Sequence, residues 1–336
     1  MRQHMRNHGS RHLLRRRATG VVAGLVVATL AACSGAGPTD AAARSAQSAR
    51  PALAAAVSGG AACVGAPNSA AAMTMDVAGK QRAFIEHLPA GFDAGRRYPA
   101  IIAFPGRGES DSLLESYAQL DGVDAIVLYA QGLNGEGGKP TWEATPYAGD
   151  SAHDYAFATD LVQWLAGSSC VDAGRVDLTG KSDGAGFAAS AACGITGVAA
   201  VATISGAFYQ EQNHCTADGR PIPILNMHGA DDPVVPYDGD PSRGLYSTQA
   251  WLRLWQQRDR CAEQGTDQAI APDVTRTTWS NCSDGTEVTN YRIADGGHTW
   301  PGATAPSGPG GTTHSIDAAQ VITAFFAAHP LAPVHP

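Results

Sequence analysis

The chain has 336 residues, of which 44% are hydrophobic and 16% charged, enough apolar material for a full core. Its 23 basic and 31 acidic residues give a net charge of −8, and an acidic surface disfavours nucleic acids and anionic membranes as partners. The cysteines show no Cys-x-x-Cys spacing of the kind that binds metals, so we expect neither a metal nor a cofactor.

Residues 1–32 predict a lipoprotein signal peptide. Six arginines without an acid precede the apolar run 18–32, which is too short to span a membrane as a settled helix. The run ends Leu30-Ala31-Ala32-Cys33 and resembles a bacterial lipobox, which implies cleavage before Cys33 and lipid on its sulfur. The alternative is an ordinary secretory signal, and the sequence leaves the general and twin-arginine routes open. We expect export, with surface anchoring at Cys33 or release outside the cell.

Residues 33–62 are rich in Ala, Ser, Gly and Pro, and such a segment buries too little apolar surface to fold by itself. We expect a tether there and a catalytic domain over 63–336. Cleavage removes six arginines, which leaves 17 basic residues against 31 acidic ones and a net charge of −14. The membrane is then a partner only through the N-terminal lipid.

Alternating strand and helix patterns run through the predicted catalytic domain. Continuous apolar runs at 99–104 and 124–130 are typical of central parallel strands, and 151–165 has a helical apolar face. This alternation predicts an α/β fold with a mostly parallel sheet and helices on both faces. We further expect strands at 81–89, 198–205, 222–227 and 286–293, and helices at 248–260 and 316–328.

The segment Gly180-Lys181-Ser182-Asp183-Gly184 follows a short apolar strand and precedes a run of small residues that fits a helix. This context predicts a nucleophile elbow that carries Ser182. The glycines allow the sharp turn, and the helix N-terminus beside the serine favours negative charge. The alternative is a plain turn between a strand and a helix.

A serine needs a base and an orienting acid, which in this fold follow it in the order Ser, Asp, His. His298 comes directly after the last predicted strand and is the preferred base, with His314 as the alternative. Asp232 follows the strand 222–227 and is the preferred acid, with Asp231 as the alternative. The oxyanion hole requires backbone N–H groups, for which we expect Asp183 and Arg107. Trp300, Trp142 and Tyr209 could line a substrate pocket or lie in the core.

An exported chain uses cysteines in disulfides, and six remain after Cys33. Cys193 ends the predicted elbow helix and Cys215 precedes the next strand, while Cys261 and Cys282 bracket one loop; this leaves Cys63 for Cys170. We therefore predict the pairs Cys63–Cys170, Cys193–Cys215 and Cys261–Cys282. Free buried thiols are the alternative.

Several motifs resemble the secreted feruloyl esterase family of α/β-hydrolases, which includes lipoproteins similar to polyhydroxybutyrate depolymerases. The similar segments run in order across nearly the whole domain: 104–108, Trp142, 153–157, 170–176, 180–187, 205–209, 228–237 and 296–302. The resemblance implies Ser182, Asp232 and His298 as the triad and supports the same cysteine pairs. One departure is Pro105, where the family usually has His.

The resemblance implies a secreted serine carboxylesterase that releases ferulate or related hydroxycinnamates from xylan through an acyl-enzyme. One alternative is a poly- or oligo(3-hydroxybutyrate) depolymerase or a short-chain acyl (acetyl xylan) esterase. Another, from a different class, is a catalytically dead surface-binding lipoprotein. In either hydrolase reading the partner is an ester, from plant cell wall or from a hydroxyalkanoate.

Overall fold

The computed structural model describes residues 55–56, 63–149, 152–212, 214–216 and 218–332. The chain divides into two units, 1–52 and 53–336, and all described residues lie in the second. The predicted signal peptide, Cys33 and most of the predicted tether lie outside the described residues. Among the helices that are described, none is long and apolar enough to cross a membrane.

One sheet organises the second unit, with the strand order β1-β2-β3-β5-β4-β8-β9-β10-β13-β12-β11. The strands from β5 to β13 in this order pair in parallel, whereas β3 and β12 join them antiparallel. The strands are β1 (Ala55–Ala56), β2 (Ala70–Val77), β3 (Lys80–His87), β4 (Tyr98–Phe104), β5 (Ile126–Ala130), β8 (Val171–Lys181), β9 (Val198–Ile204), β10 (Ile224–Gly229), β11 (Thr266–Ala271), β12 (Val274–Trp279) and β13 (Val288–Ile293).

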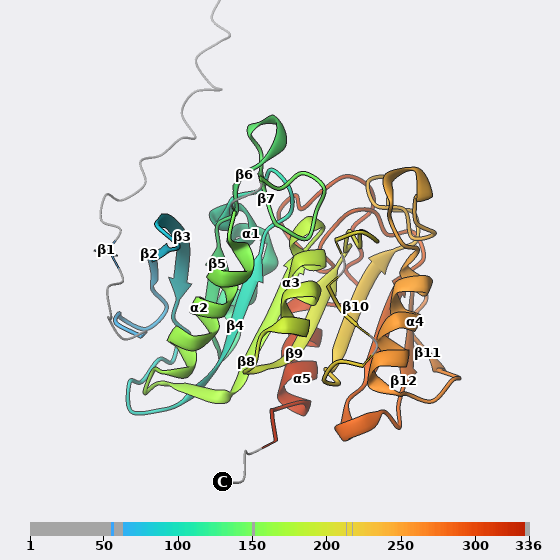
Figure 1. Cartoon of the computed structure of the whole chain (residues 1–336). Helices are drawn as coiled ribbons and strands as arrows, with labels where there is room; N and C mark the ends of the chain where they lie inside the picture. The colour runs from blue at the N-terminus through green and yellow to red at the C-terminus, as the bar shows by residue number, and fades with distance from the viewer. Residues whose placement is uncertain (1–54, 57–62, 150–151, 213, 217, 333–336) are drawn as a thin grey trace, which may run out of the picture. The chain divides into compact units, whose positions relative to one another are not determined.

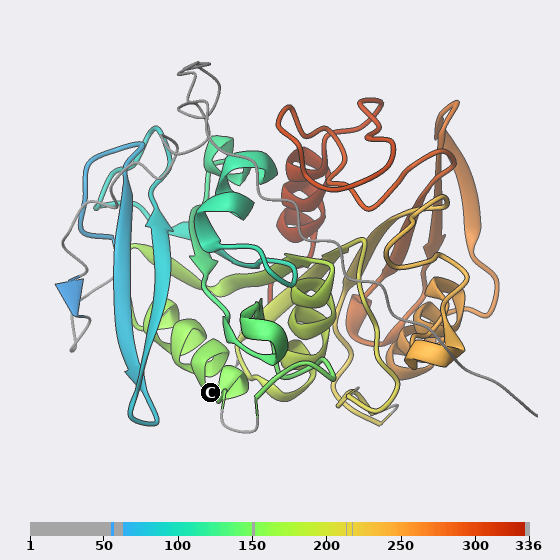
Figure 2. The ribbon, with the colours of Figure 1, turned by 90° about the horizontal axis from the view of Figure 1, so that it is seen from above.

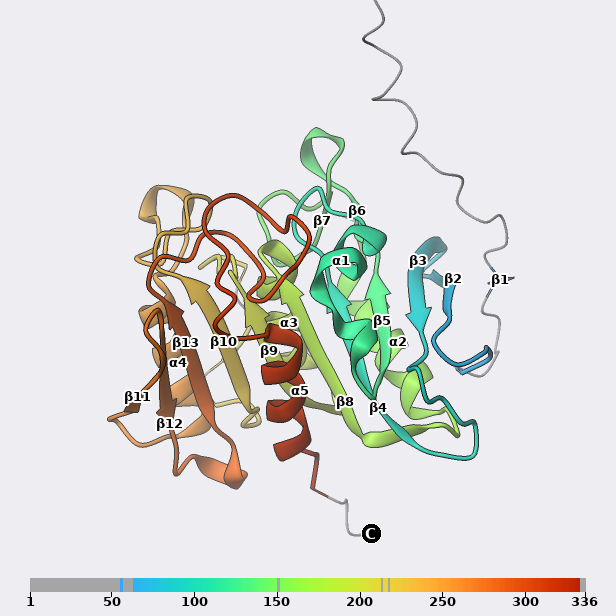
Figure 3. The ribbon, with the colours of Figure 1, turned by 180° about the vertical axis from the view of Figure 1, so that it is seen from behind.

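Helices cover both faces of this sheet. Three lie on the face seen in Figure 1 and two on the opposite face, seen in Figure 3. The first set is α2 (Asp154–Ala166), α3 (Asp183–Gly194) and α4 (Thr248–Asp259), and the second is α1 (Asp111–Ala118) and α5 (Ala318–Ala328). Because β5, β9 and β10 are buried throughout, their apolar runs face helices on both sides. The structure is the predicted α/β fold.

The sequence analysis missed several elements at the margins of the sheet. It did not predict β2, α1 or the hairpin of β11 and β12. The hairpin strand β11 is exposed along almost its whole length, so no apolar pattern marks it, and α1 has only eight residues, too few for a clear helical period. The backbone of β1, inside the predicted tether, pairs with β2.

Three disulfides join the pairs Cys63–Cys170, Cys193–Cys215 and Cys261–Cys282, which are the predicted pairs. The second ties the end of α3 to the segment before β10, and the third closes the loop that holds β11 and β12. Disulfides of this kind are typical of proteins that leave the reducing cytosol.

The loops that position the site follow β4, β8, β10 and β13 at one edge of the sheet (Figure 2). A small hairpin, β6 (Leu133–Asn134) and β7 (Pro140–Thr141), lies between β5 and α2 in the chain. Short 3-10 helices occur at Leu120–Gly122, Glu136–Gly138, Pro241–Arg243 and Ser283–Gly285. The carboxyl ends of parallel strands are the usual place for a ligand site in open α/β sheets.

Candidate active site

Ser182 lies at a sharp turn between β8, which ends at Lys181, and α3, which begins at Asp183. Its backbone has φ 55° and ψ −124°, a conformation that a residue with a side chain rarely adopts. Gly184 passes so close to the carbonyls of Phe104 and Pro105 that a Cβ there would overlap them. The turn therefore has the geometry of a nucleophile elbow.

His298 and Asp232 are joined by a hydrogen bond. The Nδ1–H of His298 donates to Oδ2 of Asp232 over 2.8 Å, while Oδ1 accepts the N–H groups of Val234 and Val235, each over 2.8 Å. Both side chains are buried, with 5% of each residue exposed. Because Nδ1 carries its proton toward the carboxylate, Nε2 is left as the basic nitrogen of the neutral ring.

His228 supports this pair from the end of β10. Its Nε2 donates to the carbonyl of Val235 over 2.9 Å and lies 3.4 Å from Oδ2 of Asp232. The Nδ1 atom lies 3.4 Å from the hydroxyl of Thr248. Nε2 thus holds the loop 229–235 and Nδ1 faces α4, so both ring nitrogens have structural partners and His228 is not a free base.

The surroundings of the pair favour the ionised form of Asp232 and the neutral form of His298. Burial raises the pKa of Asp232, but hydrogen bonds from His228 and His298 outweigh it and bring this pKa well below its usual range. Burial lowers the pKa of His298, which the contact with Asp232 only partly offsets. A neutral imidazole beside a carboxylate is the state that a general base requires.

Ser182 and His298 line the same cavity of about 260 Å³, close to the lower end of small-molecule sites at about 300–1,000 Å³. No hydrogen bond joins these two side chains within the described residues; in unliganded enzymes such contacts are often long and tighten with substrate. The alternatives Asp231 and His314 are both exposed. The structure thus brings together the three residues that the sequence favoured.

The loop after β4 presents one free backbone donor beside Ser182. The N–H of Gly106 donates to Oε2 of Glu109 over 3.0 Å, and that of Gly108 donates to the carbonyl of Pro140 over 2.8 Å. For the N–H of Arg107, the described part of the chain offers no acceptor. The N–H of Asp183 begins α3 and so has no intrahelical acceptor. Neither N–H group has an acceptor among the described residues.

The sequence of this chain is similar to those of known esterases. The chain is 29% identical over 280 residues to the esterase-type protein NocK of Nocardia uniformis subsp. tsuyamanensis, with 74% of this chain and 80% of that protein covered. It is 28% identical over 236 residues to feruloyl esterase B of Piromyces equi, covering 65% of this chain and 42% of that longer protein. No family model matches.

An acetyl xylan esterase from Aspergillus awamori has a similar structure, with a TM-score of 0.51 and 14% identity over 74% of this chain and 94% of that one. That similarity identifies the fold as the α/β-hydrolase fold. The chain is a carboxylic ester hydrolase, similar in sequence to feruloyl esterases.

An ion pair with a buried lysine lies at the wall of the active-site cavity of this esterase. Nζ of Lys181 contacts Oε1 of Glu109 at 2.7 Å, and the lysine side chain is only 2% exposed. Oε2 of the same carboxylate accepts the hydroxyl of Tyr117 over 2.7 Å as well as the N–H of Gly106. Glu109 therefore ties the loop after β4 to the residue next to Ser182. Glu109 belongs to no motif, and Lys181 is the variable residue before Ser182 in Gly-x-Ser-x-Gly, so the sequence analysis singled out neither.

Trp142 and Trp300 lie in the core rather than along the cavity. Trp142 packs against Phe104 and Phe187, and its Nε1–H donates to the carbonyl of Pro105 over 2.8 Å. Trp300 packs against Tyr117 on the other face. Trp142 thus holds the loop after β4 through the carbonyl of Pro105, the residue that departs from the feruloyl esterase pattern.

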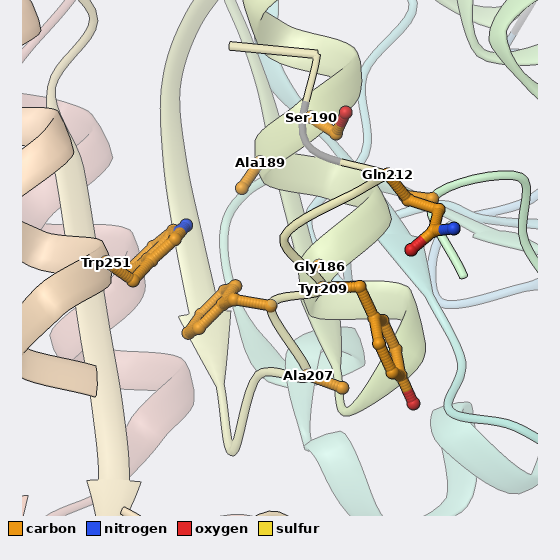
Figure 4. A pocket seen from close by; sticks show the side chains of 9 residues that line it. Gly186, Ala189, Ser190, Ala207, Tyr209, Gln212 and Trp251 are labelled. Atoms are coloured by element: carbon orange, nitrogen blue, oxygen red, sulfur yellow. The ribbon is translucent and has the colours of Figure 1, made fainter. Parts of the chain in front are cut away.

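Tyr209 does line the cavity and also borders a second, much smaller pocket between α3 and α4. In Figure 4 its hydroxyl points away from Trp251, which lies on the far side of that small pocket. The small pocket holds only about 10 Å³, room for roughly one water molecule. An acyl or alcohol group must therefore lie in the larger cavity, on the other side of Tyr209.

Proposed function

We propose that this esterase uses Ser182 as its nucleophile, His298 as its general base and Asp232 as the acid that orients the imidazole. The Ser182 hydroxyl attacks the ester carbonyl and passes its proton to Nε2 of His298. Asp232 stabilises the imidazolium, which then protonates the leaving alcohol. Water repeats the sequence on the acyl-enzyme and releases the acid.

The backbone N–H groups of Asp183 and Arg107 complete this mechanism by donating to the oxyanion in each tetrahedral intermediate. Loss of one such donor costs about 100- to 1,000-fold in rate in a well-studied hydrolase. The hydrogen bond between His298 and Asp232, at a cavity that Ser182 also lines, is the observation that carries the proposal.

The substrates that we propose are esters of plant cell-wall xylan, with ferulate or a related hydroxycinnamate as the acyl group or, as the second candidate, acetate. The names of the similar proteins, feruloyl esterase and acetyl xylan esterase, support this class. Oligomers of 3-hydroxybutyrate remain a further hydrolase alternative, and the cations of the cavity, considered below, favour testing them.

We also propose that the protein is exported. The three disulfides support an oxidising compartment. A signal peptide over 1–32, lipidation at Cys33 and a tether over 33–62 would then place the catalytic domain at the cell surface. Metabolic labelling with a radioactive fatty acid, compared between the natural chain and Cys33→Ala, tests the lipid: label on both or on neither contradicts it.

The Ser182→Ala variant tests the mechanism. We expect turnover of methyl ferulate and p-nitrophenyl acetate to fall by about a million-fold, while Ser116→Ala, an exposed serine of α1, keeps full activity. A fluorophosphonate probe should label the natural protein and Ser116→Ala but not Ser182→Ala. Turnover that persists without Ser182 contradicts the serine assignment, and a natural protein that neither turns over nor is labelled supports a binding role.

A further inference from the structure

The cavity beside Ser182 contains more positive than negative side chains, although the chain as a whole carries a net charge of −8. Its charged lining residues, apart from His298, are Arg107, Glu109, Lys139, Lys181, Asp183 and Arg243. Lys181 and Glu109 neutralise each other in the buried ion pair. Three cations then face a single carboxylate, that of Asp183.

These three cations retain hydrogen-bonding capacity for a ligand. Arg107 stacks over the ring of Tyr147 at 3.9 Å and donates from Nη2 to the carbonyl of Glu136 over 3.2 Å. Its Nε is buried without a partner in the described part of the chain. A guanidinium has five donor positions, so most of those of Arg107 stay open.

Arg243 approaches from the segment after β10. Its Nη1 donates to the carbonyl of Val234 over 2.7 Å, and its Nε lies 3.9 Å from Oδ2 of Asp240. The side chain is 38% exposed, so this long ion pair is weak in water. Lys139 lies between β6 and β7, just before Pro140. It is exposed and forms no ion pair with any described residue.

Asp183 does not neutralise these three cations. Its carboxylate accepts the hydroxyl of Thr141 over 3.2 Å, and no ion pair joins it to either arginine across the described residues. Burial raises the pKa of Asp183 to about 6, against the opposing effects of Thr141, Arg107 and Arg243. Near that pH the carboxylate carries only part of its negative charge, and the cavity keeps its positive excess.

We propose that the outer part of this cavity binds a carboxylate that the ester substrate itself carries, held between the guanidinium groups of Arg107 and Arg243. A planar guanidinium matches a carboxylate in geometry and charge, and cations that line a cleft concentrate anions within it. Lys139 adds to the attraction at the entrance. The inference rests on the proposed ester hydrolysis at Ser182 and adds a preference for esters that carry a carboxylate.

A carboxylate can reach this position from either side of the scissile bond. On the acyl side it would belong to a hemi-ester of a dicarboxylic acid. On the alcohol side it would be the free end of a hydroxyalkanoate chain or a uronate next to the esterified sugar. The chemistry recognised is the same, so the experiment includes one ester series for each side.

The experiment compares each carboxylate ester with its neutral carboxamide. The acyl series is p-nitrophenyl hemisuccinate against p-nitrophenyl succinamate, and the alcohol series is 3-(butyryloxy)butyrate against its amide. We expect kcat/KM to be about tenfold higher for the carboxylate in at least one series at low ionic strength. The preference should shrink as salt is raised to 0.5 M, because salt screens charges in open sites.

Variants assign the preference to residues. Arg243→Gln and Arg107→Gln should each reduce the ratio of carboxylate to carboxamide kcat/KM by at least fivefold, mainly through KM. Arg253→Gln, which removes an exposed arginine from α4 outside the cavity, should leave the ratio unchanged. Calorimetry with Ser182→Ala should show tighter binding of the same carboxylate ester than of its amide, independently of turnover.

Equal kcat/KM and equal binding for carboxylate and carboxamide in both series overturn the inference, as does a preference that survives both arginine variants. These outcomes differ from failure of the proposed function. If turnover persists in Ser182→Ala, or the natural protein cleaves no ester, the mechanism fails while the calorimetric comparison still decides the carboxylate site.

Discussion

Two parts of the active site differ in how they are held. The floor consists of Ser182 and His298, which line the cavity, with Asp232 hydrogen-bonded to His298, and the rim consists of the side chains of Arg107, Lys139 and Arg243. The floor residues are at most 8% exposed, and Asp232 has a partner for each carboxylate oxygen. The rim side chains are partly or fully exposed, and their charges are largely unpaired.

We expect the floor residues to carry out the reaction and the rim residues to determine which substrate binds. Floor atoms are fixed by strand ends, backbone N–H groups and a buried ion pair, so a small change there moves a reacting group. Rim cations stand on connecting segments that tolerate substitution, where binding residues are disproportionately found. Changes to the floor should therefore cost rate or stability in large steps, and changes to the rim should alter substrate preference in small ones.

Asp232→Asn should have the largest effect on the floor. An amide in place of the carboxylate can no longer stabilise the imidazolium, and the equivalent change in a serine protease lowers kcat by about 10⁴-fold. Steady-state rates on a neutral ester measure the loss, with Asp231→Asn as the matched control at the exposed neighbouring position. A loss of less than tenfold for Asp232→Asn would show that another group orients His298.

Gly184→Ala should destabilise the fold by about 4 kcal/mol or more. Its methyl group would overlap the carbonyls of Phe104 and Pro105, which belong to the backbone and cannot rotate away. Gly194→Ala, at the end of the same helix, meets no atom within 4 Å and should be neutral. Denaturant unfolding compares them, and equal stability of the two variants would contradict the tight elbow.

Glu109→Gln should lower the free energy of unfolding by about 3 kcal/mol, because it leaves the Lys181 ammonium buried without its counter-charge. The double variant with Lys181→Met should regain most of that loss, since no buried charge is then unpaired. Glu136→Gln, at an exposed position, serves as the control. A double variant as unstable as Glu109→Gln would indicate that packing, not charge, dominates.

The pH dependence of kcat/KM should report the protonation of His298, one of the floor residues. The neutral imidazole is the active form, and burial lowers its pKa from 6.5, so activity on a neutral ester should be full at neutral and alkaline pH. It should fall as the pH drops through a midpoint below 6.5, while Asp232 stays ionised. Asp183→Asn separates this limb from the titration of Asp183 near pH 6; a midpoint at 7 or above would contradict the burial effect.

Lys139→Gln should have the smallest effect, because an exposed charge at the entrance is screened by solvent. We expect the free energy of unfolding to change by less than about 0.5 kcal/mol. We also expect kcat/KM for an anionic ester to fall by about threefold at low ionic strength and to be unchanged at high salt. A larger loss that persists in 0.5 M salt would place Lys139 in direct contact with the substrate.

Much of the floor could be predicted because local sequence dictates it. The strand, Gly-x-Ser-x-Gly and small-residue helix around Ser182 follow from backbone sterics, and the order Ser, Asp, His follows from the order of the strands in the fold. The buried strands β4, β5, β9 and β10 could be predicted because a continuous apolar run indicates a strand with helices packed on both faces. Cysteine positions relative to predicted elements indicated the disulfide pairs.

Only the tertiary structure decided which side chains surround these residues. Trp142 and Trp300 are apolar rings that suit a pocket or a core equally well, and the packing places both in the core. Glu109 meets Lys181, and Arg107 and Arg243 line one cavity, only because the loops after β4 and β10 lie at the same edge of the sheet. Sequence sets the conformation of a segment, but the closeness of distant charges depends on where the sheet brings their loops.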